Sequence, residues 1–389
     1  MSAWVLPDHI ADVLPSEARH IEELRRTLLD AARSYGYELV IPPLIEHLES
    51  LLSGAGEGLD LKTFKLVDQA SGRTLGLRAD ITPQVARIDA HLLNRKGVTR
   101  LCYAGSVAHT HVAHAHATRE PFQFGAEIFG HEAIEADLES IDLIQSCLKA
   151  CGLQSLTLDL SDVRVVEALF ELQGQVSSGL RHQVLEALSV KDVPRLQALT
   201  QTFKPDVSQA LLALPGLYGD AQVLSRAQAL LPSTSLMQAA FADLTRLAQA
   251  AASSVQVTVD LSDMRGHAYY TATRFSVYAT EAQRGSPIEL ARGGRYDEVG
   301  AAFGRRRPAV GFGLDIKDLV RCLAPAGMRP VIRAPWKDDE SLQAAIRSLR
   351  NRGEVVVCVL PGHEQEVSEF DCDRELIQVN DMWLVQSLT

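Results

Sequence analysis

The fold is constrained most by the stretch Tyr35-Gly-Tyr-Glu-Leu-Val-Ile-Pro-Pro-Leu-Ile-Glu46, where a helix gives way to a strand. Upstream of it, apolar residues recur at helical spacing, with Ser16 placed as an N-cap and Gly36 placed to end the helix. These apolar positions are Ile21, Leu24, Leu28, Ala31 and Tyr35. Downstream, residues Tyr37–Ile41 have strand composition, and the prolines from Pro42 onward cannot donate to a sheet ladder. The sequence therefore predicts an amphipathic opening helix joined to a short strand.

Further strands and one more helix are expected between residues 75 and 151 and between residues 255 and 291. The strands expected are Leu75–Arg78, Arg100–Ala104, Gln123–Phe129, Val255–Asp260, Arg274–Thr280 and Ile288–Ala291, and the helix is Ile134–Cys151. Val255, Val257 and Val259 alternate with polar residues, which is typical of a half-buried strand. These elements predict a sheet with helices beside it.

Two segments stand apart from this sheet. Residues 163–252 are rich in Leu, Ala, Gln and Val at helical spacing, which predicts a helical insertion. Residues 330–389 are predicted to form a small α/β domain beyond a core of residues 1–325. Its expected elements are a helix at Asp339–Arg352 and strands at Val355–Leu360 and Leu376–Val385.

Composition narrows the class of protein. The formal net charge of −11 disfavours a nucleic-acid binder, because an acidic surface repels phosphate backbones. No apolar stretch reaches the roughly 18 residues that a membrane span requires, and the first residues lack the pattern of a signal peptide. Six scattered cysteines form neither a zinc-ribbon spacing nor a disulfide framework. We therefore expect a cytoplasmic protein without nucleic-acid or membrane partners.

Four separated segments between about residues 35 and 320 resemble the histidyl-tRNA synthetase family, in the family's order and spacing. The stretch 35–46 resembles class II motif 1, which forms the dimer, although an ordinary helix-strand joint has the same pattern. The segment Leu77-Arg-Ala-Asp-Ile-Thr-Pro-Gln-Val-Ala-Arg87 is similar to the loop that holds the amino group of histidine, with Asp80 and Thr82 at the contact positions. A carboxylate and a hydroxyl two residues apart can converge on one ammonium. Either side chain could equally cap the following helix.

The segment from Tyr103 to Glu127 resembles motif 2, with two departures. Counting back from Gln123-Phe-Gly-Ala-Glu127, His109 stands where active enzymes place the arginine that holds the ATP α-phosphate. His111 stands where they place the following glutamate. A neutral imidazole cannot replace a guanidinium that is always charged and bidentate.

The last region also departs from the family. Arg265-Gly-His-Ala-Tyr-Tyr-Thr271 resembles the histidine-specific loop and keeps its arginine and Tyr270, while His267 and Ala268 replace a leucine and an aspartate. Gly311-Phe-Gly-Leu-Asp-Ile-Lys-Asp318 resembles motif 3, but Asp318 stands at the arginine that meets the ATP γ-phosphate. Two unit charges about 4 Å apart interact by about 4 kcal/mol at an effective dielectric of about 20. Replacing attraction by repulsion should therefore abolish adenylate chemistry.

What remains is a pocket for the amino acid. The resemblance assigns the ammonium to Asp80 and Thr82, the imidazole or ammonium to Gln123 and Glu127, and the carboxylate to Arg265, with Tyr270 packing or hydrogen bonding. The alternative is that these residues persist as a polar core in which carboxylates and arginines pair with each other.

The combination resembles the regulatory subunits of ATP phosphoribosyltransferase. The resemblance implies an α+β fold: a class II aminoacyl-tRNA synthetase-like antiparallel sheet flanked by helices, with a helical insertion and a small C-terminal α/β appendage. It further implies no catalysis, no cofactor, self-association as a dimer within a hetero-oligomer, a short-form catalytic subunit as partner, and histidine as the feedback effector.

Two other functions stay open at the level of sequence. One is an active histidyl-tRNA synthetase-like ligase. The other is a stand-alone sensor of histidine or of a metal, because His109, His111, His114 and His116 could hold zinc or copper. A solvated histidine-rich loop is the plainer account of that cluster, so no metal is expected.

Overall fold

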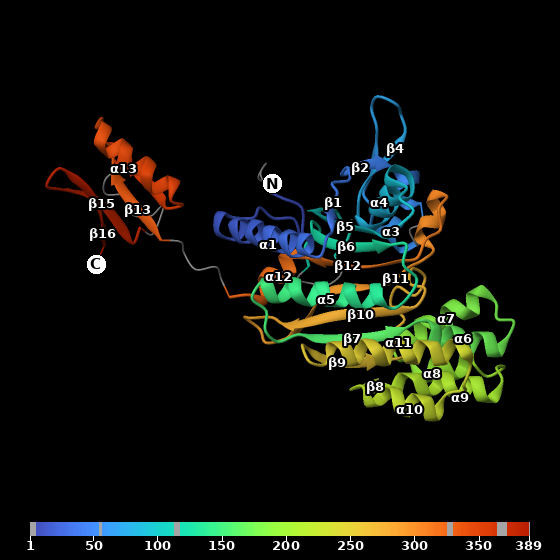
Figure 1. The fold of residues 1–389 in the computed structure, drawn as a ribbon. Coiled ribbons are helices and arrows are strands. Elements are labelled where there is room, and N and C mark those ends of the chain that lie inside the picture. Colours follow the sequence, from blue (N-terminus) through green and yellow to red (C-terminus); the bar gives the residue numbers. More distant parts are fainter. Residues whose placement is uncertain (1–4, 54–56, 113–116, 325–329, 364–371, 389) are drawn as a thin grey trace. The chain divides into compact units, whose positions relative to one another are not determined.

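The computed structural model describes residues 5–53, 57–112, 117–324, 330–363 and 372–388. The chain divides into two compact units, Met1–Ala324 and Pro325–Thr389, which are described separately below (Figure 1). None of the helices within the described residues combines the length and apolar character that crossing a bilayer requires.

A nine-stranded sheet organises the larger unit, in the order β1-β5-β6-β12-β11-β10-β7-β9-β8. The strands are β1 (Glu38–Leu39), β5 (Thr99–Ser106), β6 (Phe122–Phe129), β7 (Thr157–Asp162), β8 (Tyr218–Gly219), β9 (Gln256–Asp260), β10 (Thr273–Thr280), β11 (Pro287–Arg295) and β12 (Ala309–Asp315). From β5 to β7 every pairing is antiparallel, whereas β1 pairs with β5 and β7 pairs with β9 in parallel. The predicted antiparallel sheet is confirmed, with parallel pairs toward its margins.

One face of this sheet is apolar and covered by helices. Phe124, Ala126 and Ile128 on β6 point into a core cluster with residues of the helices that pack there. Those helices are α1 (Pro15–Ser34), α5 (Glu135–Ala150), α11 (Ser235–Ala251) and α12 (Ile316–Cys322) (Figure 1). Burying each large apolar side chain, such as the fully buried Leu28, contributes about 1.5–3 kcal/mol. The alternate residues face the other way; some are polar or glycine, as at Gln123, Gly125 and Glu127, and others, such as Leu101 and Phe129, join a second buried apolar cluster.

The opening helix differs in one detail from expectation. It begins at Pro15 after Leu14, which makes no side-chain cap, so the predicted N-cap at Ser16 is wrong. Proline suits this first position because its missing N–H would be unsatisfied there anyway. Gly36 follows the helix with φ +83°, a conformation that favours glycine. The strand expected at Tyr37–Ile41 is reduced to the two residues of β1.

A small three-stranded sheet, β2-β4-β3, lies within the same unit (Figure 1). Its strands are β2 (Ile45–His47), β3 (Lys65–Val67) and β4 (Thr74–Leu77), accompanied by α2 (Leu48–Leu52), α3 (Glu57–Lys62), α4 (Thr82–Arg87) and a π-helix at Ile88–Leu93. The expected strand at Leu75–Arg78 therefore belongs to this sheet and not to the large one. The chain passes from β4 into α4 through Asp80, which places that residue beside the large sheet.

The segment between β7 and β9 is helical, as predicted. Its elements are α6 (Arg164–Gln173), α7 (Ser178–Ser189), α8 (Val193–Leu199), α9 (Pro205–Ala213), a 3-10 turn at Leu214–Gly216, β8, α10 (Gln222–Leu230) and α11. Ser177, Asp192 and Thr234 accept backbone N–H groups as N-caps of three of these helices. A further 3-10 turn, at Val299–Phe303, follows β11.

The C-terminal unit is a four-stranded sheet, β14-β13-β15-β16, with one helix. Its elements are β13 (Val331–Pro335), α13 (Glu340–Asn351), β14 (Val355–Val359), β15 (Arg374–Val379) and β16 (Met382–Ser387). The prediction of one strand at Leu376–Val385 is wrong, because the chain turns back at Asn380 and Asp381. Both have positive φ, 48° and 61°, as in the tight turns that match strand twist.

Candidate functional site

A cavity of about 550 Å³ lies over the polar face of the large sheet. Its floor is formed by β6, β11 and β12, and Gly311 and Gly313 are among the residues that line it. At Gly311 any Cβ would overlap the carboxylate of Glu127 and the carbonyl of Ala126. The floor therefore depends on glycine to let a buried acid approach the neighbouring strand.

Glu127 is the buried acid at the centre of this floor, with 1% of its surface exposed. Its Oε1 accepts hydrogen bonds from Thr82 Oγ1 at 3.0 Å and from the Tyr103 hydroxyl at 3.2 Å, and Oε2 accepts one from the Tyr296 hydroxyl. Burial raises the pKa of this carboxyl to about 8, against the opposing effect of those hydroxyl donors. Near neutral pH it is mostly protonated, so it can donate as well as accept.

The loop between β4 and α4 is held over the floor by Gln123. Its Oε1 accepts from the Ile81 N–H at 3.0 Å, and its Nε2 donates to Asp80 Oδ1 at 2.8 Å. Asp80 Oδ1 also accepts from the Thr82 N–H at 3.0 Å. The structure thus brings Asp80, Thr82, Gln123 and Glu127 together around one cavity.

Aromatic rings form one wall of the cavity. Tyr269 stacks on Tyr296 with centroids 4.9 Å apart and meets Tyr270 edge to face at 5.4 Å. The hydroxyl of Tyr269 is buried with no hydrogen-bond partner among the described residues. Tyr270, predicted from the sequence, lines the cavity, and the flat ring faces suit a planar ligand.

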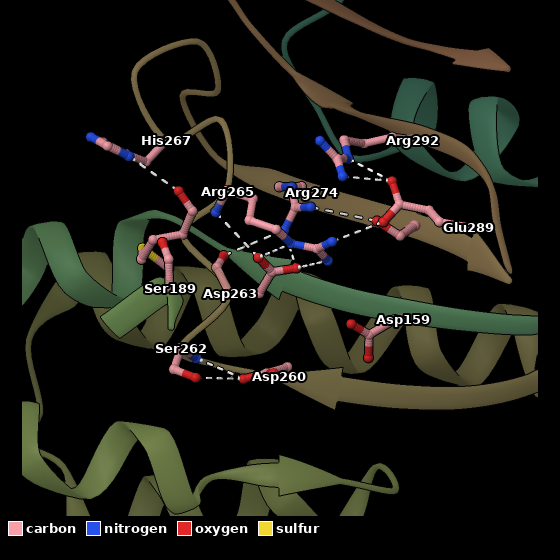
Figure 2. A network of polar contacts seen from close by, with 12 residues as sticks. Asp159, Ser189, Asp260, Ser262, Asp263, Arg265, His267, Arg274, Glu289 and Arg292 are labelled. Atoms are coloured by element: carbon pink, nitrogen blue, oxygen red, sulfur yellow. Dashed lines mark hydrogen bonds and ion pairs between the residues drawn. The ribbon is translucent and has the colours of Figure 1, made fainter. Parts of the chain in front are cut away.

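Arg265 does not line the cavity. Its guanidinium donates to Asp263 at 2.8 and 2.6 Å, to Glu289 at 3.0 Å and to the Tyr278 hydroxyl at 3.1 Å (Figure 2). Asp263 also pairs at 2.5 Å with Arg274, which is 2% exposed. The arginine that the sequence assigned to a ligand carboxylate is therefore engaged by two carboxylates of the protein.

The positions predicted to have lost the ATP contacts lie in two places. His109 lines the cavity, and its Nε2 lies 2.9 Å from the carbonyl of Ala79, while burial lowers its pKa. Asp318 also lines the cavity and pairs with Arg321 at 2.8 Å. His111 is exposed and is not a lining residue; its Nδ1 lies 3.0 Å from the Thr110 hydroxyl.

The described lining carries more acids than bases. The acids are Asp80, Glu127, Glu289, Asp315 and Asp318, and the side chains with permanent positive charge are Lys62 and Arg292. Burial, together with the neighbouring Asp318, raises the pKa of Asp315 to about 7. An imidazole whose pKa is lowered adds little positive charge at His109. The cavity therefore favours cationic and neutral groups over a triphosphate.

Two residues that hydrogen bond to Glu127 were not predicted as site residues from the sequence: Tyr296, which lines the cavity, and Tyr103, which does not. Tyr103 is directly opposite Gly125 on the neighbouring strand, and Tyr296 follows the end of β11. Period-two alternation on a strand pairing with Gln123-Phe-Gly-Ala-Glu127 could have indicated Tyr103. Nothing in the local sequence around Tyr296 shows that its hydroxyl reaches Glu127, because that contact joins residues 169 positions apart.

Among the described residues, no group of three or more His, Cys, Asp or Glu side chains could hold a metal ion. His114 and His116, half of the histidine cluster seen in the sequence, lie outside the described residues.

Two family models match this chain. The model described as Histidyl-tRNA synthetase matches residues 9–319. The model described as ATP phosphoribosyltransferase subunit HisZ C-terminal domain matches residues 329–386.

Curated relatives match along the whole chain. The ATP phosphoribosyltransferase regulatory subunit of Verminephrobacter eiseniae (strain EF01-2) is 60% identical over 389 residues, covering 100% of both chains. That of Acidovorax sp. (strain JS42) is 59% identical over the same length, again covering 100% of both.

Solved structures share the fold. A protein of Bacillus halodurans described as an ATP phosphoribosyltransferase regulatory subunit/histidyl-tRNA synthetase aligns with a TM-score of 0.81 at 27% identity, covering 96% of this chain and 98% of that chain. Histidyl-tRNA synthetase from Nostoc sp. PCC 7120 aligns with a TM-score of 0.75 at 18% identity, covering 97% and 92%, which is a likeness of fold alone. The predicted synthetase-like fold is confirmed.

Proposed function

Because this chain belongs to the family of ATP phosphoribosyltransferase regulatory subunits, we propose that it confers feedback inhibition by histidine on that enzyme. The chain itself is a non-catalytic subunit with a regulatory role in histidine biosynthesis. In this proposal the cavity over the large sheet is the effector site.

The buried Glu127 with its three hydroxyl partners is the observation that carries the proposal. Burying an acid to 1% exposure costs free energy unless the protein or a ligand hydrogen bonds to it. Here it faces a cavity walled by tyrosine rings, and with a pKa of about 8 it can donate to a neutral imidazole or accept from a charged one. Asp80 and Thr82, held by Gln123, supply the acceptors for an ammonium nearby.

Loss of nucleotide chemistry follows from the same lining. His109 and Asp318 stand in the cavity where the resemblance places two cations in active ligases. With Asp315 beside it, Asp318 repels a phosphate where an arginine would attract one. We therefore propose that neither ATP nor an adenylate binds here.

The assembly belongs to the proposal as well. We propose a short-form ATP phosphoribosyltransferase catalytic subunit as the partner, in a cytoplasmic hetero-oligomer that contains dimers of this chain. Histidine would then act by binding one quaternary arrangement more tightly than another, a coupling typically worth 1–3 kcal/mol.

Calorimetric titration of the purified chain with histidine and, separately, with ATP tests the effector site. Histidine should bind and ATP should not. Measurable ATP-pyrophosphate exchange driven by histidine would instead favour an active ligase, for which the match to the synthetase family model is the specific observation.

Inhibition of the complex tests the regulatory role. Glu127→Ala should weaken histidine inhibition while the complex still forms, and Glu171→Ala, an exposed acid on α6, should leave inhibition unchanged. Unchanged inhibition in Glu127→Ala would place the effector site elsewhere. A lone homodimer that purifies with bound metal would support the sensor alternative.

A further inference from the structure

Three arginines lie beside the cavity, Arg274 on β10, Arg292 on β11 and Arg265 in the loop after β9, and Arg265 and Arg274 both pair with Asp263 (Figure 2). Arg274 is 2% exposed and pairs with Asp263. Arg265 makes four hydrogen bonds, two of them to Asp263 and one to Glu289, and lies outside the lining. Arg274 is thus buried, and Arg265 keeps a single N–H beyond its four bonds.

Arg292 differs from both. Its side chain is 40% exposed, about the same as the 41% of Arg265, but it lines the cavity, and its one acid partner among the described residues is Glu289. Its Nε and Nη2 both lie 2.7 Å from a single oxygen, Glu289 Oε1, while Glu289 Oε2 is taken by Arg265 and Tyr278. Since a guanidinium has five N–H donors, at least three remain for a ligand.

The sheet register places Arg292 on the same face as Glu127, two strands away. Arg292 pairs with Gly313, which pairs with Gly125, two residues before Glu127 on β6. Directly paired residues share a face, so Glu127 and Arg292 project to the same side. Their Cα atoms are offset by about 7 Å along the strands and about 10 Å across two strand spacings. Gly313, on the strand between them, lines the cavity and adds no side chain to this face, whereas the Tyr103 hydroxyl lies over Gly125.

We infer that Arg292, and not Arg265, binds the α-carboxylate of the amino-acid effector. The inference rests on the proposed histidine site. Histidine carries its ring and its carboxylate at opposite ends, which matches the acid Glu127 on one strand and, two strands away, the guanidinium of Arg292 with its unused donors. Arg265 then acts as a positioning residue, holding Glu289 so that Arg292 presents its remaining donors to the cavity.

Calorimetric titrations of the full chain with histidine and with histidinamide, which lacks the carboxylate, test this assignment. Arg292→Gln should weaken histidine binding by about 10- to 100-fold, the range for a hydrogen-bonded charge, and leave histidinamide binding unchanged. Arg292→Lys should recover part of the loss. Arg19→Gln, an exposed arginine on α1, is the matched control and should bind both ligands like the wild type. Far-UV circular dichroism of each variant verifies folding.

Other outcomes separate the two proposals. If Arg265→Gln loses histidine selectively while Arg292→Gln binds like the wild type, the assignment to Arg292 is overturned and the histidine site stands. Equal loss of both ligands in Arg292→Gln also overturns it, because the side chain then shapes the cavity without reading the carboxylate. If the wild type binds no histidine, the proposed function and this inference fail together.

Discussion

Replacing Glu127 by glutamine should change how the stability of the protein depends on pH. Burial raises the pKa of this carboxyl from 4.5 to about 8. The folded chain therefore holds the proton more tightly than the unfolded chain, and between those two values the folded state binds more protons. By linkage, the free energy of unfolding falls as pH rises through that window.

The expected size follows from the pKa values. The difference between 4.5 and about 8 corresponds to about 5 kcal/mol, at about 1.4 kcal/mol for each pH unit. About 4 kcal/mol of this should be lost between about pH 5 and about pH 8. An amide does not titrate, so Glu127→Gln should gain stability relative to the wild type by that amount over the same range.

Urea denaturation followed by far-UV circular dichroism, at both pH values, measures this difference. Glu171→Gln, at an exposed position on α6, is the control and should track the wild type. The absolute stability of Glu127→Gln also reflects its altered hydrogen bonds, so the informative quantity is the change with pH. A difference between variant and wild type that stays constant from pH 5 to pH 8 would refute the buried, proton-binding role of Glu127.

Three further predictions concern the same region. Gly311→Ala should destabilise the protein by about 1–3 kcal/mol in thermal unfolding, because its Cβ overlaps the Glu127 carboxylate, whereas Gly58→Ala, which meets open space, should not. Tyr296→Phe removes a hydroxyl that donates to Glu127 and should weaken histidine binding about tenfold, measured by calorimetry. Tyr218→Phe, at an exposed ring, is the control and should bind histidine like the wild type. Equal histidine affinities of the two variants would count against a role for the Tyr296 contact. Asp263→Ala leaves the buried Arg274 without its acid partner and should lower the free energy of unfolding by about 3–5 kcal/mol, measured by urea denaturation. Asp206→Ala, at an exposed acid, should lower it little. A small decrease in both variants would mean that Arg274 finds another partner.

The sequence alone determined the family, the fold class and the substitutions that argue against nucleotide chemistry. The strand expected at Gln123–Phe129 is present, and because side-chain direction in a strand depends on residue parity, Gln123 and Glu127 share one of its faces. Helical periodicity likewise predicted the insertion between β7 and β9. The identities of residues 109 and 318 required no coordinates at all.

Only the tertiary structure decided which arginine faces the cavity. Arg265 and Arg292 both lie in segments that the sequence singled out, and neither segment shows which acid each guanidinium contacts. A register shift between Val277 and Tyr278 breaks the alternation of β11 and lets Glu289 join the face that carries Arg292. The hydroxyl of Tyr296 likewise reaches Glu127 only through the pairing of β6, β12 and β11. Such contacts depend on strand register over long separations, which local sequence patterns do not encode.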